Sequence, residues 1–550
     1  MPDPDAPAQE RLCQVDVQCW GSILDEPKAP CELTVTDGDG TLAYQGSAGF
    51  ELRGRSSLYF PKKQYSLELR DHTELPVWPG ATWQYLDDGT DPGASWSSPG
   101  FDDGRWGSGA APMGSGADWL QTVLQPTLTT YFRKNFTVGD LSQVTRVEIG
   151  VKSTGGVAVY VGGVEVIRQD LVPEAAPDTP AFGTIGDGST WSQFEIDPSL
   201  LVAGDNQLAV EVHRQVLEED LRFDLYLEAT GEDHDADLLG MGADDEWILN
   251  GQYVDRALFR NRLAYDLFQS FGGPEHYATE TRFCEMTLDG EYLGVYTLGE
   301  KLERGEDRLP LGKGEQPGES FLVKLDDDEG FHDNTAGYGT WQLVWPDEDP
   351  EVLAAVSTIL AGWEAASGDD IFAWVDLDSA VDWVLLQEFM KNNDAYFLSV
   401  YLWRDSGGKL HFAPWDFDLT LGGYPIRDCG AEGWNPRTWY GTSGDPVEID
   451  YIQKMDAVPA FRDRLVTRWN ELRQGELSEA SILARIEGYD AVLAPAIPDQ
   501  VARWPVDEIS FAPAGEDWLC PSATYDEEHE HVLSFISERL AWMDAHIGEF

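Results

Sequence analysis

Three aspartates, Asp394, Asp416 and Asp418, have the type and spacing that could do chemistry. Asp394 follows a helical pattern. The other two follow the second of two apolar, alternating segments, 396–403 and 410–415, which are joined by a turn with two glycines. This pattern predicts a hairpin, whose outer ends lie together, so we expect the three carboxylates to converge. Converging carboxylates repel one another unless a cation lies among them, which indicates a metal site. The alternative is three solvated acids in an acid-rich chain.

Helical patterns dominate the chain after residue 350 and surround this hairpin. Apolar residues recur there at intervals of three and four, as in helices that bury one face. An earlier helix is predicted before the Gly-Gly-Pro sequence that ends at Pro274. The predicted helices span residues 255–268, 351–366, 371–391, 459–474, 478–495 and 526–547.

Residues 14–75 have the alternating pattern of β-strands. The last strand predicted there, 61–70, places Lys63 on the same face as Tyr65. A lysine on an apolar face could contact a phosphate. Alternatively, Lys62 faces inward, or both lysines extend their charged ends to water. Further strands are predicted over residues 283–288, 292–298 and 320–325.

Residues 78–230 differ in character, because Gly, Trp and Asp are frequent and no helical period is present. Short strands separated by Gly and Asp turns predict a β-sandwich. The Phe101-Asp-Asp sequence and the strand spacing resemble the galactose-binding-like jelly-roll sandwiches that are appended to glycan-active enzymes. We expect most of the aromatic residues in the core, and a carbohydrate partner is a further expectation for this region.

The composition is that of a globular protein with several domains. The chain has 550 residues, of which 42% are hydrophobic, and its net charge is −62. Such a negative surface repels nucleic acid and anionic membranes, so we expect neither as a partner. No apolar run approaches the length of a transmembrane helix. The acidic run 326–329 could bind a metal but is more typical of a solvated loop.

The six cysteines suggest an oxidising compartment. Three of them lie in the first 31 residues and none forms a C-x-x-C pair. Cys429 and Cys520 lie in loop-like sequence. We expect disulfides, with buried free thiols as the alternative, and the pairing is not readable from the sequence. The polar N-terminus lacks the features of a signal peptide and suggests the start of a mature secreted protein, so an extracellular or surface location is expected.

Several short segments, in this order, resemble the CotH (spore-coat protein H) kinase family, an atypical branch of the protein-kinase-like fold. They are Arg53-Gly-Arg-Ser-Ser57 with Pro61-Lys-Lys63, Asp255-Arg256 with Arg260-Asn261, Tyr292-Leu-Gly-Val-Tyr296 with Glu300-Lys301, Asn393-Asp394, and Trp415-Asp-Phe-Asp418. The resemblance covers about 30–76 and 236–475. It implies ATP-dependent phosphorylation of Ser or Thr in proteins, with Mg²⁺ or Mn²⁺.

The resemblance also implies roles for single residues. Asp394 would accept the proton of the substrate hydroxyl or orient that hydroxyl. Asp416 would hold the metal that bridges the phosphates, and Asp418 would supply a second oxygen ligand. The glycine-rich loop, the H-R-D and the D-F-G sequences of ordinary kinases are absent.

The nucleotide would then be bound by residues of the first part of the chain and by Glu300. Lys63, or else Lys62, would contact the α- and β-phosphates. Glu300 would lie near the hinge between two lobes or pair with a cation, and Arg260 is expected to be structural. The remaining residues expected at the nucleotide are Arg53, Ser56 and Ser57.

The expected fold is α+β. It has two lobes like an atypical protein kinase, a β-rich first lobe and a helical second lobe, with an inserted all-β jelly-roll sandwich. The expected divisions are 1–77 for the start of the first lobe, 78–230 for the sandwich, 231–345 for the rest of the first lobe and 346–550 for the second lobe. Insertion of a sandwich in an exposed loop is well tolerated.

Two other functions compete with the kinase. A non-catalytic surface adhesin or glycan-binding protein could use the same scaffold and sandwich, but binding alone does not require three converging acids. A glycan hydrolase would need a carboxylate pair beside an aromatic groove and no nucleotide site.

Overall fold

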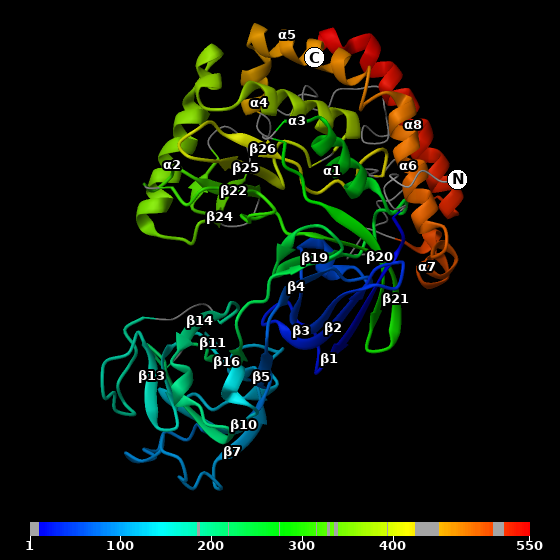
Figure 1. Cartoon of the computed structure of the whole chain (residues 1–550). Coiled ribbons are helices and arrows are strands. Elements are labelled where there is room, and N and C mark those ends of the chain that lie inside the picture. Colours follow the sequence, from blue (N-terminus) through cyan, green and yellow to red (C-terminus); the bar gives the residue numbers. More distant parts are fainter. Residues whose placement is uncertain are drawn as a thin grey trace.

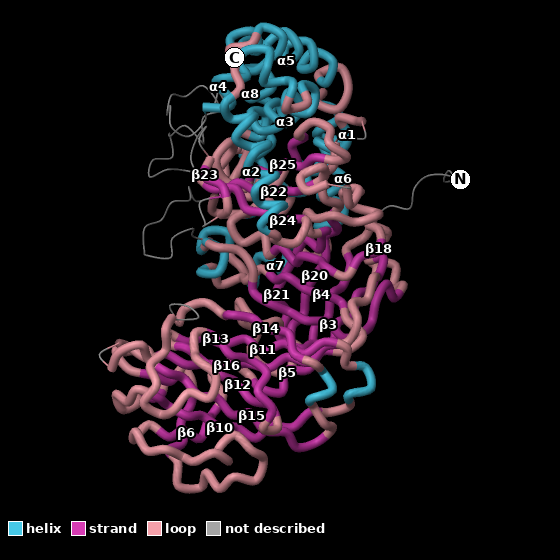
Figure 2. Tube along the Cα trace, turned by 90° about the vertical axis from the view of Figure 1, so that its left-hand side faces the viewer, coloured by secondary structure: helices cyan, strands magenta, loops and turns pink. Residues whose placement is uncertain are grey.

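The computed structural model describes residues 10–183, 188–217, 219–273, 276–314, 316–326, 330–334, 339–392, 394–423, 450–509 and 522–550. The expectations for Asn393, Cys429 and Cys520 lie outside these residues. Three parts follow one another through the molecule: a β-sandwich, a β-barrel and a part rich in helices, with the barrel in the middle (Figures 1 and 2). The fold is α+β, as expected.

Seven strands close the barrel. In spatial order they are β1 (Cys13–Cys19), β2 (Ala29–Thr36), β3 (Leu42–Leu52), β4 (Tyr65–Leu69), β19 (Glu246–Asn250), β21 (Glu291–Glu300) and β20 (Thr281–Leu288). Alternate residues such as Cys31, Leu33 and Val35 of β2 point into the core, as the period of a strand requires. β1 closes the barrel by pairing in parallel with β20.

The chain leaves the barrel after β4 and re-enters it at β19, although these two strands pair with each other. Two packed sheets lie between them in the sequence. The first sheet has the order β13 (Val164–Gln169), β12 (Gly156–Val161), β15 (Gly204–His213), β10 (Thr129–Val138), β6 (Thr82–Leu86) and β7 (Gly107–Ala110). The second has β14 (Ser192–Ile196), β11 (Arg146–Ser153), β16 (Arg222–Thr230), β8 (Met113–Gly114) and β9 (Thr122–Val123), with β5 (Thr73–Val77) beside β16. The short pair β17 (Ala236–Asp237) and β18 (Ala243–Asp244) precedes β19.

One hydrophobic core fills the space between the two sheets. Its aromatic members are Trp83, Phe132, Phe136 and Phe223, so these rings do serve as core. β5 belongs to this sandwich and begins at Thr73, five residues before the expected boundary at residue 78.

The helical part contains a five-stranded sheet. Its order is β23 (His332–Asp333), β24 (Thr340–Trp345), β22 (Phe321–Asp326), β25 (Val400–Arg404) and β26 (His411–Ala413). Strands β22 to β24 were expected in the first lobe, but β22 pairs with β25 and β24 pairs with β22. Apolar residues of these strands belong to the same core as the helices. The alternating pattern shows that one face of a strand is buried, but not which part of the molecule covers it.

The helices are α1 (Arg260–Ser270), α2 (Pro350–Ala365), α3 (Leu377–Met390), α4 (Asp450–Asp456), α5 (Pro459–Leu472), α6 (Glu479–Leu493), α7 (Ile497–Arg503) and α8 (Tyr525–His546). α2, α5, α6 and α8 begin and end within two residues of the predicted bounds. α1 begins later than predicted, at Arg260 rather than 255, because the side chain of Asp255 accepts the backbone N–H groups of Ala257 and Arg260 and forms a turn instead. No helix in the described part of the chain is both long and apolar enough to span a membrane.

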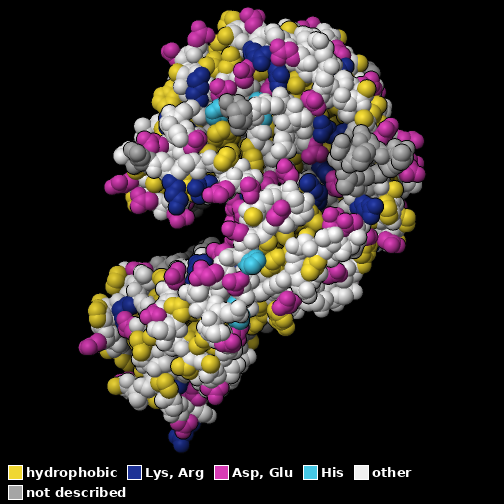
Figure 3. Space-filling view, in the orientation of Figure 1, with side chains coloured by type: hydrophobic (Ala, Val, Ile, Leu, Met, Phe, Trp, Pro, Cys, Tyr) yellow, Lys and Arg dark blue, Asp and Glu magenta, His cyan; other side chains and the backbone are white. Residues whose placement is uncertain are grey.

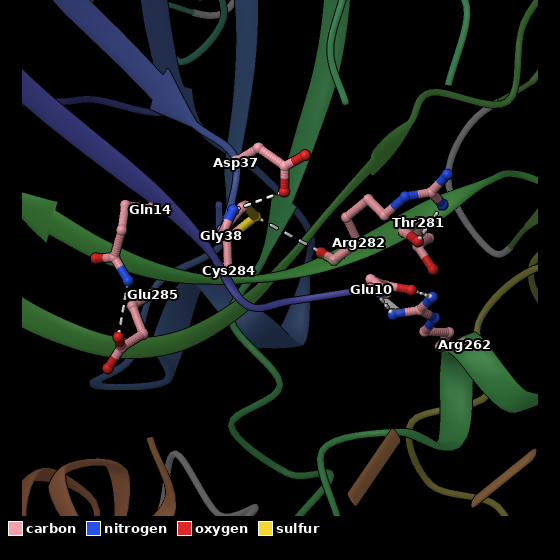
Figure 4. The surroundings of a disulfide bond; sticks show 10 residues. Glu10, Gln14, Asp37, Gly38, Arg262, Thr281, Arg282, Cys284 and Glu285 are labelled. Atoms are coloured by element: carbon pink, nitrogen blue, oxygen red, sulfur yellow. Dashed lines mark hydrogen bonds and ion pairs between the residues drawn. A yellow bond between two sulfur atoms is a disulfide. The ribbon is translucent and has the colours of Figure 1, made fainter. Parts of the chain in front are cut away.

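Two disulfides, Cys13–Cys284 and Cys19–Cys31, confirm the expectation for four of the cysteines. The first joins β1 to β20, and beside it Glu10 pairs with Arg262 of α1 (Figure 4). The start of the described chain is thus fixed both to the barrel and to the helical part. Asp and Glu side chains are scattered over the visible face, and a wide hollow separates the sandwich from the helical part (Figure 3).

Candidate functional site

A cavity of about 760 Å³ lies between the barrel and the helical part. The barrel side contributes the segment 53–64, β19 and the end of β21. The helical side contributes β22, the turn 394–399 and the segment 415–419. Asp394, Asp416 and Asp418 line this cavity together. The structure therefore brings together the three acids that the hairpin pattern predicted.

The local structure explains why Asp394 reaches the cavity. Helix α3 ends where Lys391 adopts a left-handed conformation, with φ 52°, and its N–H bonds to carbonyls of the last turn. The side chain of Asn392 then accepts the N–H of Asp394 (3.1 Å) and donates to the carbonyl of Asp416 (3.1 Å). Asn392 thus joins the two ends of the hairpin formed by β25 and β26.

The segment that carries Asp416 and Asp418 is held by α1. Asp416 has φ 65°, a conformation that is unfavourable for most residues and persists where surrounding contacts impose it. Its N–H donates to the hydroxyl of Tyr265 (3.3 Å), and the next N–H, of Phe417, donates to the amide oxygen of Asn261 (2.6 Å). Ser399 donates to the carboxylate of Asp416 (3.3 Å).

A buried ionic network fixes the same segment from behind. Arg260 binds Asp255 (2.7 Å) and Glu528 of α8 (2.6 Å), and its Nε donates to the carbonyl of Thr420 (2.8 Å). Arg256 also pairs with Glu528 (3.1 Å). Arg260 is fully buried and does not line the cavity, so its structural role, expected from the sequence, fits this geometry.

A fourth acid, Asp326 at the end of β22, also lines the cavity. The acidic run 326–329 is more typical of a solvated loop, but Asp326 is buried. Lys324, two residues earlier on the same strand, lines the cavity as well and forms an ion pair with Asp326. The signal that could have identified both residues is an acid at the last position of a buried strand.

Burial and like charges shift the titration of these acids. Burial, with a smaller contribution from the charges of Asp416 and Asp326, raises the pKa of Asp394 to about 7. Burial also raises the pKa of Asp416, although Ser399 and Arg53 oppose the shift. Burial and the charge of Asp416 raise the pKa of Asp418 well above its usual range. A divalent cation would remove the repulsion that contributes to these shifts.

The donor set fits Mg²⁺ or Mn²⁺, which prefer carboxylate oxygens. Mg²⁺ is usually held by one or two carboxylates together with phosphate oxygens, so two of these acids are enough to hold the ion. Within the described ranges, the single acidic triad whose ligand atoms all lie within 4.8 Å of one another is Glu68, Asp233 and Asp245, which lies outside the cavity. Lys28 and Arg70 already pair with Glu68, so this outer triad is balanced by cations.

Arg53, Ser56 and Ser57 line the barrel side of the cavity, as expected for an anion site. Gly54 has φ +99°, and a Cβ there would lie 1.8 Å from the hydroxyl oxygen of Ser57, so only glycine fits this turn. The guanidinium of Arg53 lies over the ring of Trp415, 5.6 Å from its centre. Burial lowers the pKa of Arg53, although Tyr401 and Asp416 oppose the shift. Within the part of the chain that the structure describes, this guanidinium forms no hydrogen bond or ion pair.

Lys62 and Lys63 do not have the position expected of a phosphate contact, whereas the alternative that Lys62 faces inward agrees with its burial. Strand β4 begins at Tyr65, so both lysines precede it, and neither lines the cavity. Lys62 is buried, and its Nζ donates to the carbonyl of Val295 (2.5 Å) and to Gln500 of α7 (3.2 Å). Lys63 donates to the carbonyl of Leu58 (2.5 Å). Backbone carbonyls hold both ammonium groups, which a count of strand positions did not predict.

Glu300, the last residue of β21, lines the cavity on the barrel side. Its Oε2 accepts the N–H of Glu280 (2.6 Å) and the hydroxyl of Tyr277 (3.2 Å). Burial raises the pKa of Glu300 to about 7, against the opposing effects of the Glu280 N–H and of Arg308.

Similar solved structures share little with the chain. A glycosyl hydrolase family 2 member from Bacteroides cellulosilyticus matches 29% of this chain and 21% of its own, with 13% identity and a TM-score of 0.21. A β-glucuronidase from Bacteroides uniformis matches 29% of this chain and 18% of its own, with 18% identity and a TM-score of 0.21. TM-scores this low support no conclusion about this chain.

Sequence comparisons are more informative. The inner spore coat protein H of Bacillus subtilis (strain 168) is 24% identical over 188 residues, which are 32% of this chain and 49% of that protein. The chain thus spans about half the length of this relative. The family described as "CotH kinase protein" matches residues 220–543, more than half of the chain, and the matched range includes Glu300 and the three predicted aspartates. The chain belongs to the CotH kinase protein family.

Proposed function

We propose that this protein is an atypical protein kinase that transfers the γ-phosphate of ATP to Ser or Thr hydroxyls of secreted or surface proteins, with Mg²⁺ or Mn²⁺. Family membership supports the class of activity. The barrel would be the first lobe and the helical part the second lobe of a kinase-like fold. The sandwich would be an inserted module that lies outside the reaction site.

The observation that carries the proposal is the distribution of charge in one cavity. Asp394, Asp416 and Asp418 line the helical side, and Arg53 lines the barrel side together with the hydroxyls of Ser56 and Ser57. Carboxylates suit a hard divalent cation, whereas a guanidinium and hydroxyls suit phosphate oxygens. A metal–nucleotide complex needs carboxylates for its metal ion and a guanidinium or hydroxyls for its phosphates in the same cavity.

The residues of the cavity would have separate roles in phosphoryl transfer. Arg53, Ser56 and Ser57 would bind the phosphates, and Lys324 would take the role that the family resemblance implies for Lys63 or Lys62. Asp416 and Asp418 would hold the metal, which supplies charge neutralisation of the phosphates when bound. Asp394 would orient the substrate hydroxyl and accept its proton. Phosphoryl transfer depends mainly on such positioning and charge stabilisation.

The test is transfer of labelled γ-phosphate from ATP to the chain itself or to a general acceptor protein, with Mg²⁺ and with Mn²⁺. We expect transfer by the wild type and a loss of at least about 100-fold in Asp394→Asn, because a positioned base contributes about 10²–10⁴-fold. Equal transfer by this variant would contradict the role of Asp394. Absence of both transfer and nucleotide binding in the wild type would favour the non-catalytic alternative.

The name of the relative and the two disulfides agree with a location outside the cytoplasm, which we propose for this chain. Protein substrates follow from the proposed activity. A carbohydrate partner of the sandwich stays a proposal, to be tested by glycan binding to the whole chain.

A further inference from the structure

One wall of the cavity is polar but mostly uncharged. It is formed by Gln252, Thr279, Thr281 and Thr297, all on the barrel side and all at least nine-tenths buried. Thr281 on β20 lies opposite Gly299 on β21, and the side chain of Gln252 donates to the hydroxyl of Thr297 (2.6 Å). We call these four residues, with Gly299 and Glu300, the polar wall.

Three atoms of the polar wall have no hydrogen-bond partner in the described ranges. They are the hydroxyl oxygens of Thr279 and Thr281 and the amide oxygen of Gln252. A buried polar group without a partner costs about 1–3 kcal/mol, so native structures contain few of them. Three on one wall of one cavity indicate a ligand that supplies the missing partners.

Glu300 adds a directed acceptor to this wall. Both of its hydrogen bonds, from Glu280 and Tyr277, end on Oε2. Its Oε1 has no hydrogen bond among the described residues. The fixed Oε2 sets the orientation of the carboxylate, so Oε1 can accept an N–H from a bound molecule.

The same wall has room for a flat group. A Cβ at Gly299 would lie 2.9 Å from Cγ2 of Thr281, so a side chain at this position would crowd the strand pair and cover the wall. Ile248 of β19 supplies an apolar surface in the same lining. A planar, uncharged group that forms hydrogen bonds fits a polar wall beside an apolar surface. A sugar fits it less well, because the hydroxyl groups around the sugar ring need hydrogen-bond partners on all sides.

We propose that the polar wall binds the base of the nucleotide and that Glu300 selects bases with an exocyclic amino group. This inference rests on the proposed function, because the phosphate-binding residues stand in the same cavity. The amino group of adenine donates to Oε1 of Glu300. A base with a carbonyl oxygen in place of this amino group would put two hydrogen-bond acceptors, its oxygen and Oε1 of Glu300, against each other. Such a base is therefore bound less well.

The experiment compares ATP with inosine triphosphate, which carries a carbonyl oxygen in place of the amino group. In the phosphoryl-transfer assay, KM and kcat are measured for both nucleotides with the wild type, Glu300→Gln and Glu285→Gln. Glu285 lies on β20 and bonds to Gln14 and Tyr292 outside the cavity, so its variant is a matched control.

We expect the wild type and the control to prefer ATP by about tenfold or more in kcat/KM, the value of a hydrogen bond to a charged group. Glu300→Gln should reduce this preference to within about threefold, mainly through KM, because a carboxamide can also donate. An unchanged preference in Glu300→Gln, with transfer from ATP intact, overturns this inference alone. Failure of the wild type to bind or use any nucleotide overturns the proposed function as well.

A second variant tests the unpartnered hydroxyls separately from folding. The double change Thr279→Val and Thr281→Val removes two hydroxyls that have no partner in the described structure, so the unfolding temperature of the free protein should not fall. The rise in unfolding temperature on addition of ATP should shrink, because the base loses two partners. A full rise with ATP would overturn the role of these threonines.

Discussion

Arg53 and Lys62 are nine residues apart and lie beside the same turn, but their surroundings differ: Arg53 is half-buried and Lys62 is buried. The guanidinium of Arg53 lines the cavity and has no ionic partner in the described chain. The ammonium of Lys62 is engaged by Val295 and Gln500. Of these two cations, only Arg53 is therefore placed to bind phosphate.

The corresponding prediction concerns nucleotide affinity. Arg53→Met should raise the Kd of ATP by about tenfold or more, because a charged hydrogen bond to phosphate is lost. Lys62→Met should change it by less than about threefold, since this side chain lies outside the cavity. Equilibrium titration of both variants with ATP tests the assignment. A larger loss of ATP affinity in Lys62→Met than in Arg53→Met would instead support a phosphate contact of Lys62.

Glu300 gives the site a predicted pH dependence. Burial raises the pKa of Glu300 to about 7, while the Glu280 N–H and Arg308 oppose this shift and Tyr277 stays protonated because its own pKa is raised. Above this pH the carboxylate accepts the amino group of adenine, and below it the protonated carboxyl is a poorer acceptor. The preference for ATP over inosine triphosphate should therefore rise between about pH 6 and pH 8.

Comparison of the two nucleotides at each pH cancels the titration of their phosphates. Glu300→Gln should remove the pH dependence of the preference. A preference that is independent of pH in the wild type would show that Glu300 does not contact the base.

Residues of the site differed in how far the sequence could predict them. Asp394, Asp416 and Asp418 were predicted because one local hairpin joins them. Lys324 and Asp326 were not, because β22 reaches the hairpin only by pairing with β25, more than 70 residues later. The lysines were misplaced because the chain turns before β4, where strand alternation does not apply.

At the scale of elements, α8 holds the segment of Asp416 and Asp418 in place through Glu528. This carboxylate is buried between Arg260 and Arg256 and also accepts the hydroxyl of Ser522 (2.6 Å). Burial opposes its ionisation, but the two arginines outweigh this effect and lower the pKa of Glu528 to about 2. α8 thus supports the site although none of its residues lines the cavity.

Glu528→Ala should lower the free energy of unfolding by about 3–5 kcal/mol, because two buried guanidinium groups lose their partner. Glu530→Ala, on the exposed face of the same helix, should change it by less than about 0.5 kcal/mol. Denaturant unfolding checks both values. Since the pKa of Glu528 is lowered by folding, its contribution is complete above about pH 4.5 and is lost as the pH falls toward 2.

Most helices were predictable because their apolar period is local, and four of them match the predicted bounds within two residues. The closure of the barrel was not predictable. It depends on the pairing of β1 with β20 and on the Cys13–Cys284 disulfide, which joins residues 271 positions apart. Neither contact leaves a signal in a single sequence.

At the scale of the whole molecule, the sandwich is an insertion between two paired strands of the barrel. β4 and β19 pair in register, so a short linker can replace the intervening module. The main ionic contact across this junction is Arg70, which pairs with Glu228 of the sandwich and also with Glu68 of the barrel. Without the sandwich, Arg70 would keep Glu68 and Asp233 as acidic partners.

We therefore predict that replacing residues 73–230 with a short Gly-Ser linker leaves a soluble chain that still binds ATP with an affinity within about threefold of the full chain. Size-exclusion chromatography and nucleotide titration test this prediction. Insoluble protein, or loss of nucleotide binding in a folded product, would contradict an insertion that is independent of the site.

The central claim is that the cavity between the barrel and the helical part binds a metal–nucleotide complex through Asp416 and Asp418. Calorimetric titration of a non-hydrolysable ATP analogue, with and without Mn²⁺, tests it most directly. The wild type and Glu68→Gln, a variant of the outer acidic triad, should bind the analogue only with the metal, and Asp416→Asn should lose this binding. Equal metal-dependent binding by Asp416→Asn, or its loss in Glu68→Gln alone, would contradict the claim.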